Sequence, residues 1–280
     1  MWLPWQDAVW LAIGLAVTAT AMRVQAPPRR WLWVRDLAKE GAILLILYAM
    51  WQFVGNHSKG DGSDAVSHAF AIVRFERAVH LPSEAGLQHV ALHSHLIIKA
   101  ANDYYIVGHV PVIGILLVWL YVRHRPDFAR WRTVLAVGSI VGVLVQAFPV
   151  APPRLTLSSI VDTMRLYGPR VYANDGAGFA PQLAAMPSLH CVWAITTGAA
   201  VFYVAKSRWR WIGPAHAVVT VLVVVVTGNH YWLDAFAAVP LVLLGLAVAE
   251  ASAHLRRRKR TGTADASLVS PVERGASSRT

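Results

Sequence analysis

Long stretches without a charged side chain recur along this chain, and they constrain its fold more than any other feature. Of its 280 residues, 56% are hydrophobic and only 15% are charged. A helix needs about 17–25 mostly apolar residues to cross a bilayer. We therefore predict an all-α fold, a polytopic integral membrane helical bundle of about six core spans plus one N-terminal span. The expected spans are 8–22, 37–55, 105–122, 133–150, 189–205, 211–228 and 235–251.

The first expected span is short and contains Thr18 and Thr20. An interfacial helix is the alternative for this segment. Between the second and third spans, residues 65–100 have helical periodicity interrupted at Pro82. This pattern predicts two amphipathic helices lying on the outer membrane face. Small residues at Gly14, Gly114 and Gly198 are expected to allow close helix packing.

Three regions follow from these patterns: residues 1–36 hold the N-terminal span and a basic cytoplasmic loop, residues 37–254 form the membrane domain, and residues 255–280 form a basic, disordered cytoplasmic tail. The formal charge of +11 does not indicate a nucleic-acid partner, because the basic residues cluster between apolar segments. Cytoplasmic loops of membrane proteins carry such clusters. The denser clusters are Arg23, Arg29, Arg30 and Arg35; Arg123, Arg125, Arg130 and Arg132; Lys206, Arg208 and Arg210; and residues 256–260.

This charge pattern places the loops after the second, fourth and sixth spans on the opposite, extracytoplasmic side. We expect a protein of a bacterial plasma membrane whose C-terminus is cytoplasmic. Three segments at span ends then share the outer face: PVAPPRL (149–155), AAMPSLHCVWA (184–194) and TGNHYWLDA (227–235). Their polar side chains are the candidates for chemistry.

His230 and Asp234 are four residues apart, so on a helix they would share a face. A carboxylate in that position can fix the imidazole tautomer and leave the other ring nitrogen basic. The alternative is an interfacial pair that caps the helix. Ser188 precedes a span and can cap it, which puts His190 just inside the helix, near an anion held at the helix start. An ordinary cap beside an interfacial histidine is the alternative there.

Arg154 follows two prolines and could grip phosphate oxygens, although an arginine that snorkels to lipid headgroups has the same sequence signature. The spacing of His89, His93 and His95 could suit a metal, but no acidic or cysteine partner lies near them in the sequence. We therefore predict no metal site.

The Pro-Ser-x-His and Gly-Asn-His-x-x-x-Asp segments together resemble the type 2 phosphatidic acid phosphatase superfamily. The forms APPRL, AAMPSLH and TGNHYWLDA resemble its inositol phosphorylceramide synthase-like (inositolphosphotransferase-like) branch, over residues 37–250. The resemblance implies that His230 attacks phosphorus and forms a phosphohistidine, that Asp234 orients it, and that His190 acts as acid and then base. Ser188 and Arg154 would hold the phosphate oxygens. No metal or organic cofactor is implied.

Two phosphate-binding cations typical of the superfamily are missing. The only Arg-Pro pair, Arg125-Pro126, falls on the wrong face, and Val223 and Val224 stand where Ser-Arg is usual. These absences favour a phosphodiester substrate. Further candidates for substrate contacts are Tyr105, His109, Lys99, Arg165 and Arg170. For Tyr105 and His109 the alternative is an aromatic belt with a histidine at the lipid headgroups.

The predicted function is cleavage or transfer of a lipid-linked phosphate, with a phospholipid or similar lipid as substrate and water or an alcohol as acceptor. The sequence does not separate phosphatase from phosphotransferase. A non-catalytic lipid-binding or lipid-transport protein on the same scaffold is the alternative from another class.

Overall fold

A computed structural model describes residues 3–25, 28–57, 62–168 and 183–268 of the chain. Within these ranges the structure is helical, with turns, loops and one isolated parallel bridge between Val150 and Ala184. The all-α prediction is confirmed. The helices are α1 (Trp5–Val24), α2 (Leu32–His57), α3 (Gly62–Ala78), α4 (Glu84–Leu92), α5 (His95–Asp103), α6 (His109–Arg123), α7 (Arg125–Val145), α8 (Pro153–Thr156), α9 (Thr163–Tyr167), α10 (Leu189–Val204), α11 (Ile212–Val226) and α12 (Trp232–Leu268), with short helical turns at Arg29–Trp31, Tyr104–Gly108 and Arg208–Trp211.

Among the described residues, five helical segments are long and apolar enough to cross a membrane, and the chain is an integral membrane protein. A sixth span results if His95–Gly108 and Pro111–Arg123, which meet at an angle of 48°, count as one. The helix at the fifth predicted span, α10, is apolar but has only 16 residues. At about 1.5 Å per residue it is shorter than the hydrocarbon layer. The five segments are Trp5–Val24, Arg29–Val54, Arg125–Val145, Arg208–Val226 and Trp232–Arg258.

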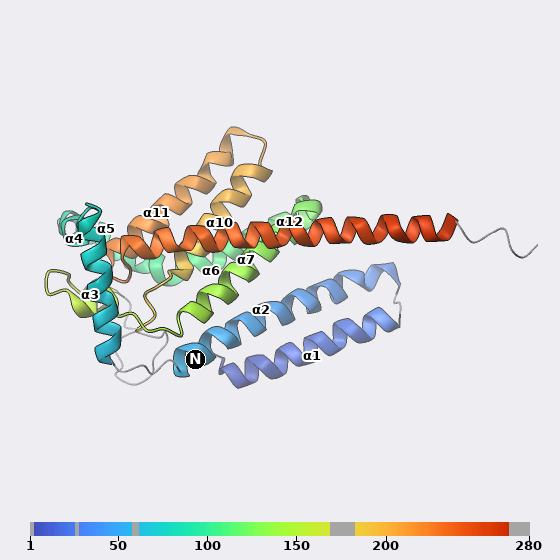
Figure 1. The fold of residues 1–280 in the computed structure, drawn as a ribbon, viewed down its shortest axis with the longest axis horizontal. Coiled ribbons are helices and arrows are strands. Elements are labelled where there is room, and N and C mark those ends of the chain that lie inside the picture. Colours follow the sequence, from blue (N-terminus) through green and yellow to red (C-terminus); the bar gives the residue numbers. More distant parts are fainter. Residues whose placement is uncertain (1–2, 26–27, 58–61, 169–182, 269–280) are drawn as a thin grey trace, which may run out of the picture.

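Helix α10 is the centre of the bundle, where it packs against α6, α7, α11 and α12. The α1–α2 hairpin joins this bundle through α2 and α7, and α3, α4 and α5 gather at the end where α12 begins (Figure 1). The largest buried cluster includes Trp131, Leu120 and Val192, which belong to α7, α6 and α10. The short helices therefore cover one end of a tightly packed bundle.

The segment predicted as two amphipathic helices contains three, because a second break falls at Ser94. The Ser94 hydroxyl accepts a hydrogen bond from the Ile97 N–H (3.4 Å) and begins α5, just as Ser83 begins α4. A π-helical turn over Tyr104–Gly108 then joins α5 to α6. Such turns shift the register of side chains along a helix. The prediction missed this second cap.

The predicted role of glycine in helix packing holds at one of three positions. A Cβ on Gly198 would meet the carbonyl oxygen of Gly213 at 2.8 Å, so α10 and α11 approach backbone to backbone. Nothing lies within 4 Å of a Cβ built on Gly14 or Gly114. The expectation for those two residues was wrong, because both face away from their neighbours.

The C-terminal region also differs from its prediction. Helix α12 runs on to Leu268, so residues 255–268 are helical rather than disordered. Residues 255–260 are Leu, Arg and Lys, which favour a helix. Residues 269–280 lie outside the described ranges. The basic clusters near Arg125, Arg210 and Arg256 sit at the ends of α7, α10–α11 and α12 that are remote from His190 and His230. Figure 1 shows the connection between α10 and α11 away from the end at which α12 begins.

Candidate active site

Backbone hydrogen bonds bring the three polar segments together. Val150 N–H donates to the Leu183 carbonyl (2.7 Å) and Ala185 N–H donates to the Val150 carbonyl (3.1 Å). On the other side, Arg154 N–H donates to the Gly228 carbonyl (2.9 Å). The segment 149–155 therefore lies between the other two and ties them to each other.

Gly228 is required by the turn that precedes His230. Its φ of +70° is a left-handed conformation that side chains other than glycine rarely adopt. A Cβ at this position would also meet Ile160 Cγ2 at 2.8 Å and Arg154 Cβ at 3.3 Å. The turn can therefore pack against the segment that carries Arg154 only because residue 228 has no side chain.

His230 is buried, and its ring is fixed by two acceptors. Nδ1 lies 2.8 Å from the Ala185 carbonyl oxygen and 3.2 Å from Asp234 Oδ2. A carbonyl oxygen can only accept, so Nδ1 carries the proton and Nε2 keeps its lone pair. In the neutral imidazole, this arrangement leaves Nε2 as the ring nitrogen with the lone pair.

Asp234 orients His230 in a different way from the one predicted. His230 is not on the helix, because α12 begins at Trp232. Asp234 lies in the first turn of α12, and its Oδ2 accepts a hydrogen bond from Tyr231 N–H (2.9 Å) as well as facing His230. The carboxylate is fully buried and caps its own helix while it contacts the imidazole. The predicted contact and the alternative capping role therefore occur together.

Ser188 is the N-cap of α10, as the sequence predicts. Its hydroxyl accepts from Cys191 N–H (3.3 Å), and the side chain is fully buried. His190 is consequently the second residue of α10. Just before it, Gln146 donates to the Pro187 carbonyl (3.0 Å), which holds the entry to the helix against the end of α7.

The two imidazoles, forty positions apart in sequence, face each other. The ring centroids of His190 and His230 are 5.8 Å apart, at an interplanar angle of 65°. Tyr105, from the π-helical turn, lies against both: its ring centroid is 4.4 Å from that of His190 and 6.3 Å from that of His230. The structure thus places three aromatic rings around one point at the covered end of the bundle.

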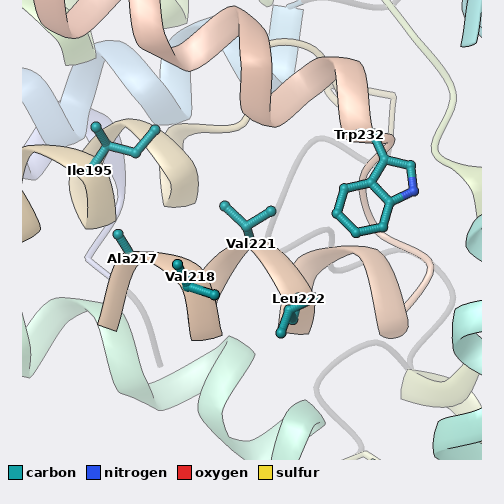
Figure 2. A pocket seen from close by; sticks show the side chains of 6 residues that line it. All are labelled: Ile195, Ala217, Val218, Val221, Leu222 and Trp232. Carbon is teal, nitrogen blue, oxygen red and sulfur yellow. The ribbon is translucent and has the colours of Figure 1, made fainter. Parts of the chain in front are cut away.

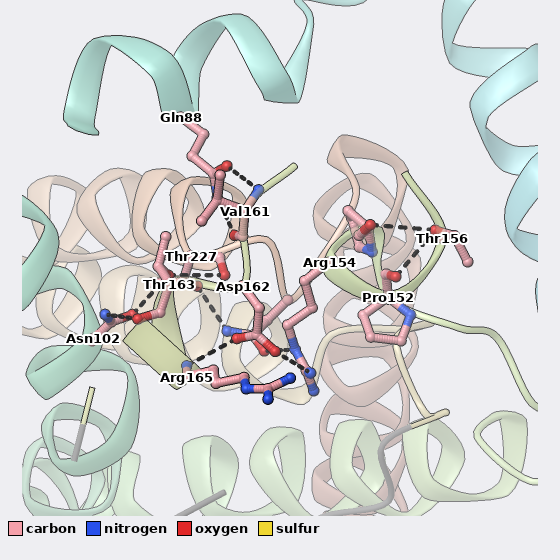
Figure 3. A network of polar contacts seen from close by, with 12 residues as sticks. Gln88, Asn102, Pro152, Arg154, Thr156, Val161, Asp162, Thr163, Arg165 and Thr227 are labelled. Atoms are coloured by element: carbon pink, nitrogen blue, oxygen red, sulfur yellow. Dashed lines mark hydrogen bonds and ion pairs between the residues drawn. The ribbon is translucent and has the colours of Figure 1, made fainter. Parts of the chain in front are cut away.

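Arg154 lies beside this group and is largely buried. Its Nε donates to Asn229 Oδ1 (3.0 Å), in the residue before His230, and its Nη1 lies 3.2 Å from Asp162 Oδ2 (Figure 3). Asp162 also begins α9, where its Oδ1 accepts from Arg165 N–H (3.0 Å). Two fixed partners therefore hold the guanidinium, and one of them is the residue that precedes His230.

The other candidate substrate contacts are more scattered. Lys99 pairs with Asp103 on the exposed side of α5 (2.8 Å). The side chain of Arg165 is exposed, although its backbone binds Asp162. The side chain of His109 and the whole of Arg170 lie outside the described parts of the chain. Of these possible contacts, Tyr105 is the one that the structure brings against both histidines.

Glu76 is a site residue that the sequence analysis missed. It comes from α3, is 4% exposed, and its Oε1 accepts from Leu233 N–H (2.7 Å) in the first turn of α12. Burial and then the nearby Glu84 raise the pKa of Glu76 to about 8. No local pattern indicates such a residue, because its partner lies on a distant helix.

Gln88 and Asn102 form a second set of supports. Gln88 donates to the carbonyls of Val161 and Val226 (both 3.0 Å) and accepts from Val161 N–H (2.7 Å). Asn102 and Thr163 exchange two hydrogen bonds, of 2.9 and 3.0 Å (Figure 3). Both networks fix the loop that presents Asp162 to Arg154.

An apolar pocket of about 290 Å³ opens between α10, α11 and the start of α12. Figure 2 shows Val221 and Trp232 facing each other across it. Every lining side chain is hydrophobic, so the pocket itself offers nothing for phosphate chemistry. It is lined by Ile195, Ala217, Val218, Val221, Leu222 and Trp232.

Comparison with known proteins identifies the family of the chain. A search of curated proteins and a search of solved structures each gave no match. A family model described as PAP2 superfamily matches residues 70–248, a range that contains all three polar segments and both histidines. This match covers well over half of the chain. The chain belongs to the PAP2 superfamily.

Proposed function

We propose that the protein transfers a lipid-linked phosphoryl group through a phosphohistidine on His230. The superfamily comprises phosphatases and phosphotransferases in general, which supports this class of reaction. The observation that carries the proposal is the pair of facing imidazoles, 5.8 Å apart, of which His230 has its Nδ1 bound to the Ala185 carbonyl. That arrangement supplies a nucleophile and, beside it, a group that can move a proton.

In the first step, the lone pair of His230 Nε2 forms a bond to phosphorus while the bond to the leaving lipid oxygen breaks. His190, protonated, gives its proton to that oxygen, so that the lipid leaves as an alcohol. The positive charge that develops on His230 is stabilised by Asp234, whose Oδ2 lies 3.2 Å from Nδ1. Arg154 and the start of α10 at Ser188 hold the phosphate oxygens.

In the second step, His190, now neutral, takes a proton from water or from an alcohol whose oxygen attacks phosphorus. The bond between nitrogen and phosphorus breaks and returns its electrons to Nε2. Water yields a free phosphate or phosphomonoester, and an alcohol yields a new ester. His190 is protonated again and ready for the next cycle.

We further propose that the reaction resembles that of the inositol phosphorylceramide synthase-like branch and takes place on the extracytoplasmic face. Basic clusters at the other end of α7, α10 and α12 support this orientation. An assay with labelled phospholipid in membranes, with and without candidate alcohols, separates the two outcomes. Acceptor-dependent product means transferase, and release of phosphate alone means phosphatase.

The test of the nucleophile is His230→Ala, with His190→Ala and Asp234→Ala beside it. We expect near-complete loss in the first, a loss of about 10²–10⁴ in the second, and a partial loss in the third. Acid-labile phosphohistidine should form from labelled lipid in the wild type and be absent in His230→Ala. His254→Ala, an exposed histidine near the far end of α12, is the matched control.

Turnover in His230→Ala at the wild-type rate would refute the proposal. If purified protein binds phospholipid but turns over none, then the non-catalytic lipid-binding or lipid-transport alternative is correct. The facing histidines weigh against that alternative, because lipid binding alone has no use for a nucleophile oriented by a buried carboxylate.

A further inference from the structure

Asp162 forms an ion pair with Arg154, the residue proposed above to hold the phosphate oxygens, and so places a negative charge next to the proposed phosphate site. The carboxylate lies 3.2 Å from Arg154 Nη1, and the Arg154 side chain is only 7% exposed. We infer that Asp162 sets the charge preference of the site, so that it accepts a singly charged phosphodiester in preference to a doubly charged phosphomonoester. This inference rests on the proposed function and names its substrate class.

Asp162 is held in place rather than free to swing away. Its Oδ1 caps α9 through Arg165 N–H, and its Oδ2 faces Arg154. The next residue, Thr163, is fully buried and bonded to Asn102 and to the Thr227 carbonyl. A phosphate held by Arg154 would therefore always lie near the Asp162 carboxylate.

The charge balance follows from Coulomb's law. Arg154 alone would attract a dianion more strongly than a monoanion. The Asp162 carboxylate repels the dianion more strongly as well, so it cancels much of that advantage. A phosphomonoester carries a charge of about −1.5 to −2 at pH 7, whereas a diester carries one. The low exposure of Arg154 keeps this interaction from being screened by salt.

The other charges near the site do not favour the dianion in the same way: the proton that His190 carries passes to the leaving oxygen of either lipid. Asp234 is acidic and bound to His230, while Lys99 is paired with Asp103. Arg165 is the basic residue nearest to Asp162 in the described sequence, but its side chain is exposed. Asp162 is thus a specificity-determining residue that acts through Arg154.

The test is Asp162→Asn in the full-length protein. Asparagine keeps an oxygen for the cap of α9 and removes the charge. Phosphatidic acid and phosphatidylinositol with the same acyl chains are compared by release of their common product, diacylglycerol, at fixed pH and ionic strength. We expect the ratio of kcat/KM for the monoester over the diester to rise by about tenfold or more. Asp64→Asn, an exposed aspartate on α3, is the control and should leave the ratio unchanged.

A ratio that stays constant in Asp162→Asn, or a parallel loss on both lipids, would overturn the inference and assign Asp162 a purely structural role. A second readout does not depend on turnover: the affinities of inorganic phosphate and dimethyl phosphate, measured by thermal shift. Phosphate should bind about tenfold more tightly to Asp162→Asn, with a smaller change for dimethyl phosphate. Equal changes for both would contradict the inference. Diacylglycerol release that survives in His230→Ala would instead refute the proposed function, so the two failures are distinguishable.

Discussion

The carbonyl oxygen of Ala185 lies 2.8 Å from Nδ1 of His230, whereas Oδ2 of Asp234 lies 3.2 Å from the same nitrogen. A main-chain acceptor therefore determines the protonated nitrogen, and the aspartate adds charge to an orientation that already exists. Ala185 reaches this position because its own N–H is bonded to Val150. Removing the carboxylate and removing the imidazole should consequently have different effects.

For Asp234→Asn we expect a loss of activity of about 10–100-fold, far less than for His230→Ala. Both hydrogen bonds of Asp234 use Oδ2, so an amide oxygen placed there can keep them while the negative charge disappears. Measurement of kcat on a phospholipid substrate provides the check, with Asp127→Asn in the first turn of α7 as control. If Asp234→Asn were as inactive as His230→Ala, the negative charge of Asp234 would matter more for activity than the hydrogen bonds that orient His230.

Tyr105 should act through its ring. We expect Tyr105→Phe to stay near wild-type kcat and Tyr105→Ala to lose about three- to tenfold, because an aromatic contact of this kind contributes about 0.5–1.5 kcal/mol. The ring of Tyr105 packs 4.4 Å from that of His190, so we expect its loss to act through the position of His190. Equal losses in both variants would point instead to the hydroxyl group.

The stability of the protein should fall as pH rises, because of Glu76. The pKa of this residue is about 8 in the fold and 4.5 ordinarily. Below pH 4.5 both the folded and unfolded states hold the proton. Between 4.5 and 8 the unfolded chain releases it while the fold keeps it, so the free energy of unfolding decreases, and above 8 the effect is complete.

Glu76→Gln keeps the acceptor for Leu233 N–H and cannot ionise. Its Tm should match the wild type near pH 5 and exceed it near pH 8, in detergent at constant ionic strength. Glu84 and Asp234 are the acidic groups near Glu76 and remain in the variant. Glu250→Gln, which removes a carboxylate paired with Arg130 at the other end of the bundle, should leave the slope of Tm against pH unchanged. A wild-type slope in Glu76→Gln would show that another group is responsible.

Gly228→Ala should destabilise the protein by about 1–2 kcal/mol or more, because the left-handed conformation is unfavourable for alanine and the new Cβ meets Ile160. We also expect kcat to fall, because the same turn positions Asn229, which accepts a hydrogen bond from Arg154. Thermal unfolding and kcat together test this. Gly14→Ala, where a Cβ meets nothing within 4 Å, should be neutral or slightly stabilising. An unchanged Tm in Gly228→Ala would exclude a strained turn.

Local features of the site could be read from the sequence, while those made by tertiary contacts could not. The cap at Ser188 is set by the four residues that follow it, and the sequence predicts it correctly. The pairing of His230 with Asp234 was predicted from helical spacing, yet His230 lies before the helix. A carboxylate in the first turn of a helix can contact a residue before the helix, as Asp234 does here. The same four-residue spacing therefore fits both this arrangement and a pair on one helical face.

Glu76 and Asp162 had no local signal that marked them as site residues. Glu76 binds the backbone of Leu233, 157 positions away, and such a contact leaves no pattern in the residues around it. Asp162 could have been predicted as a helix cap, but its ion pair with Arg154 depends on how the loop folds back. The helical composition of the membrane domain was predictable throughout, because the bilayer allows few alternatives to helices.

Helix α12 carries Asp234 in its first turn and continues for 37 residues, or about 55 Å. A hydrocarbon layer of about 30 Å accounts for little more than half of that length. The remainder is a stiff rod that leaves the bundle, as Figure 1 shows. A soluble helical protein fused in register to this helix would be held rigidly. It would provide the asymmetric feature that image alignment needs for so small a membrane protein.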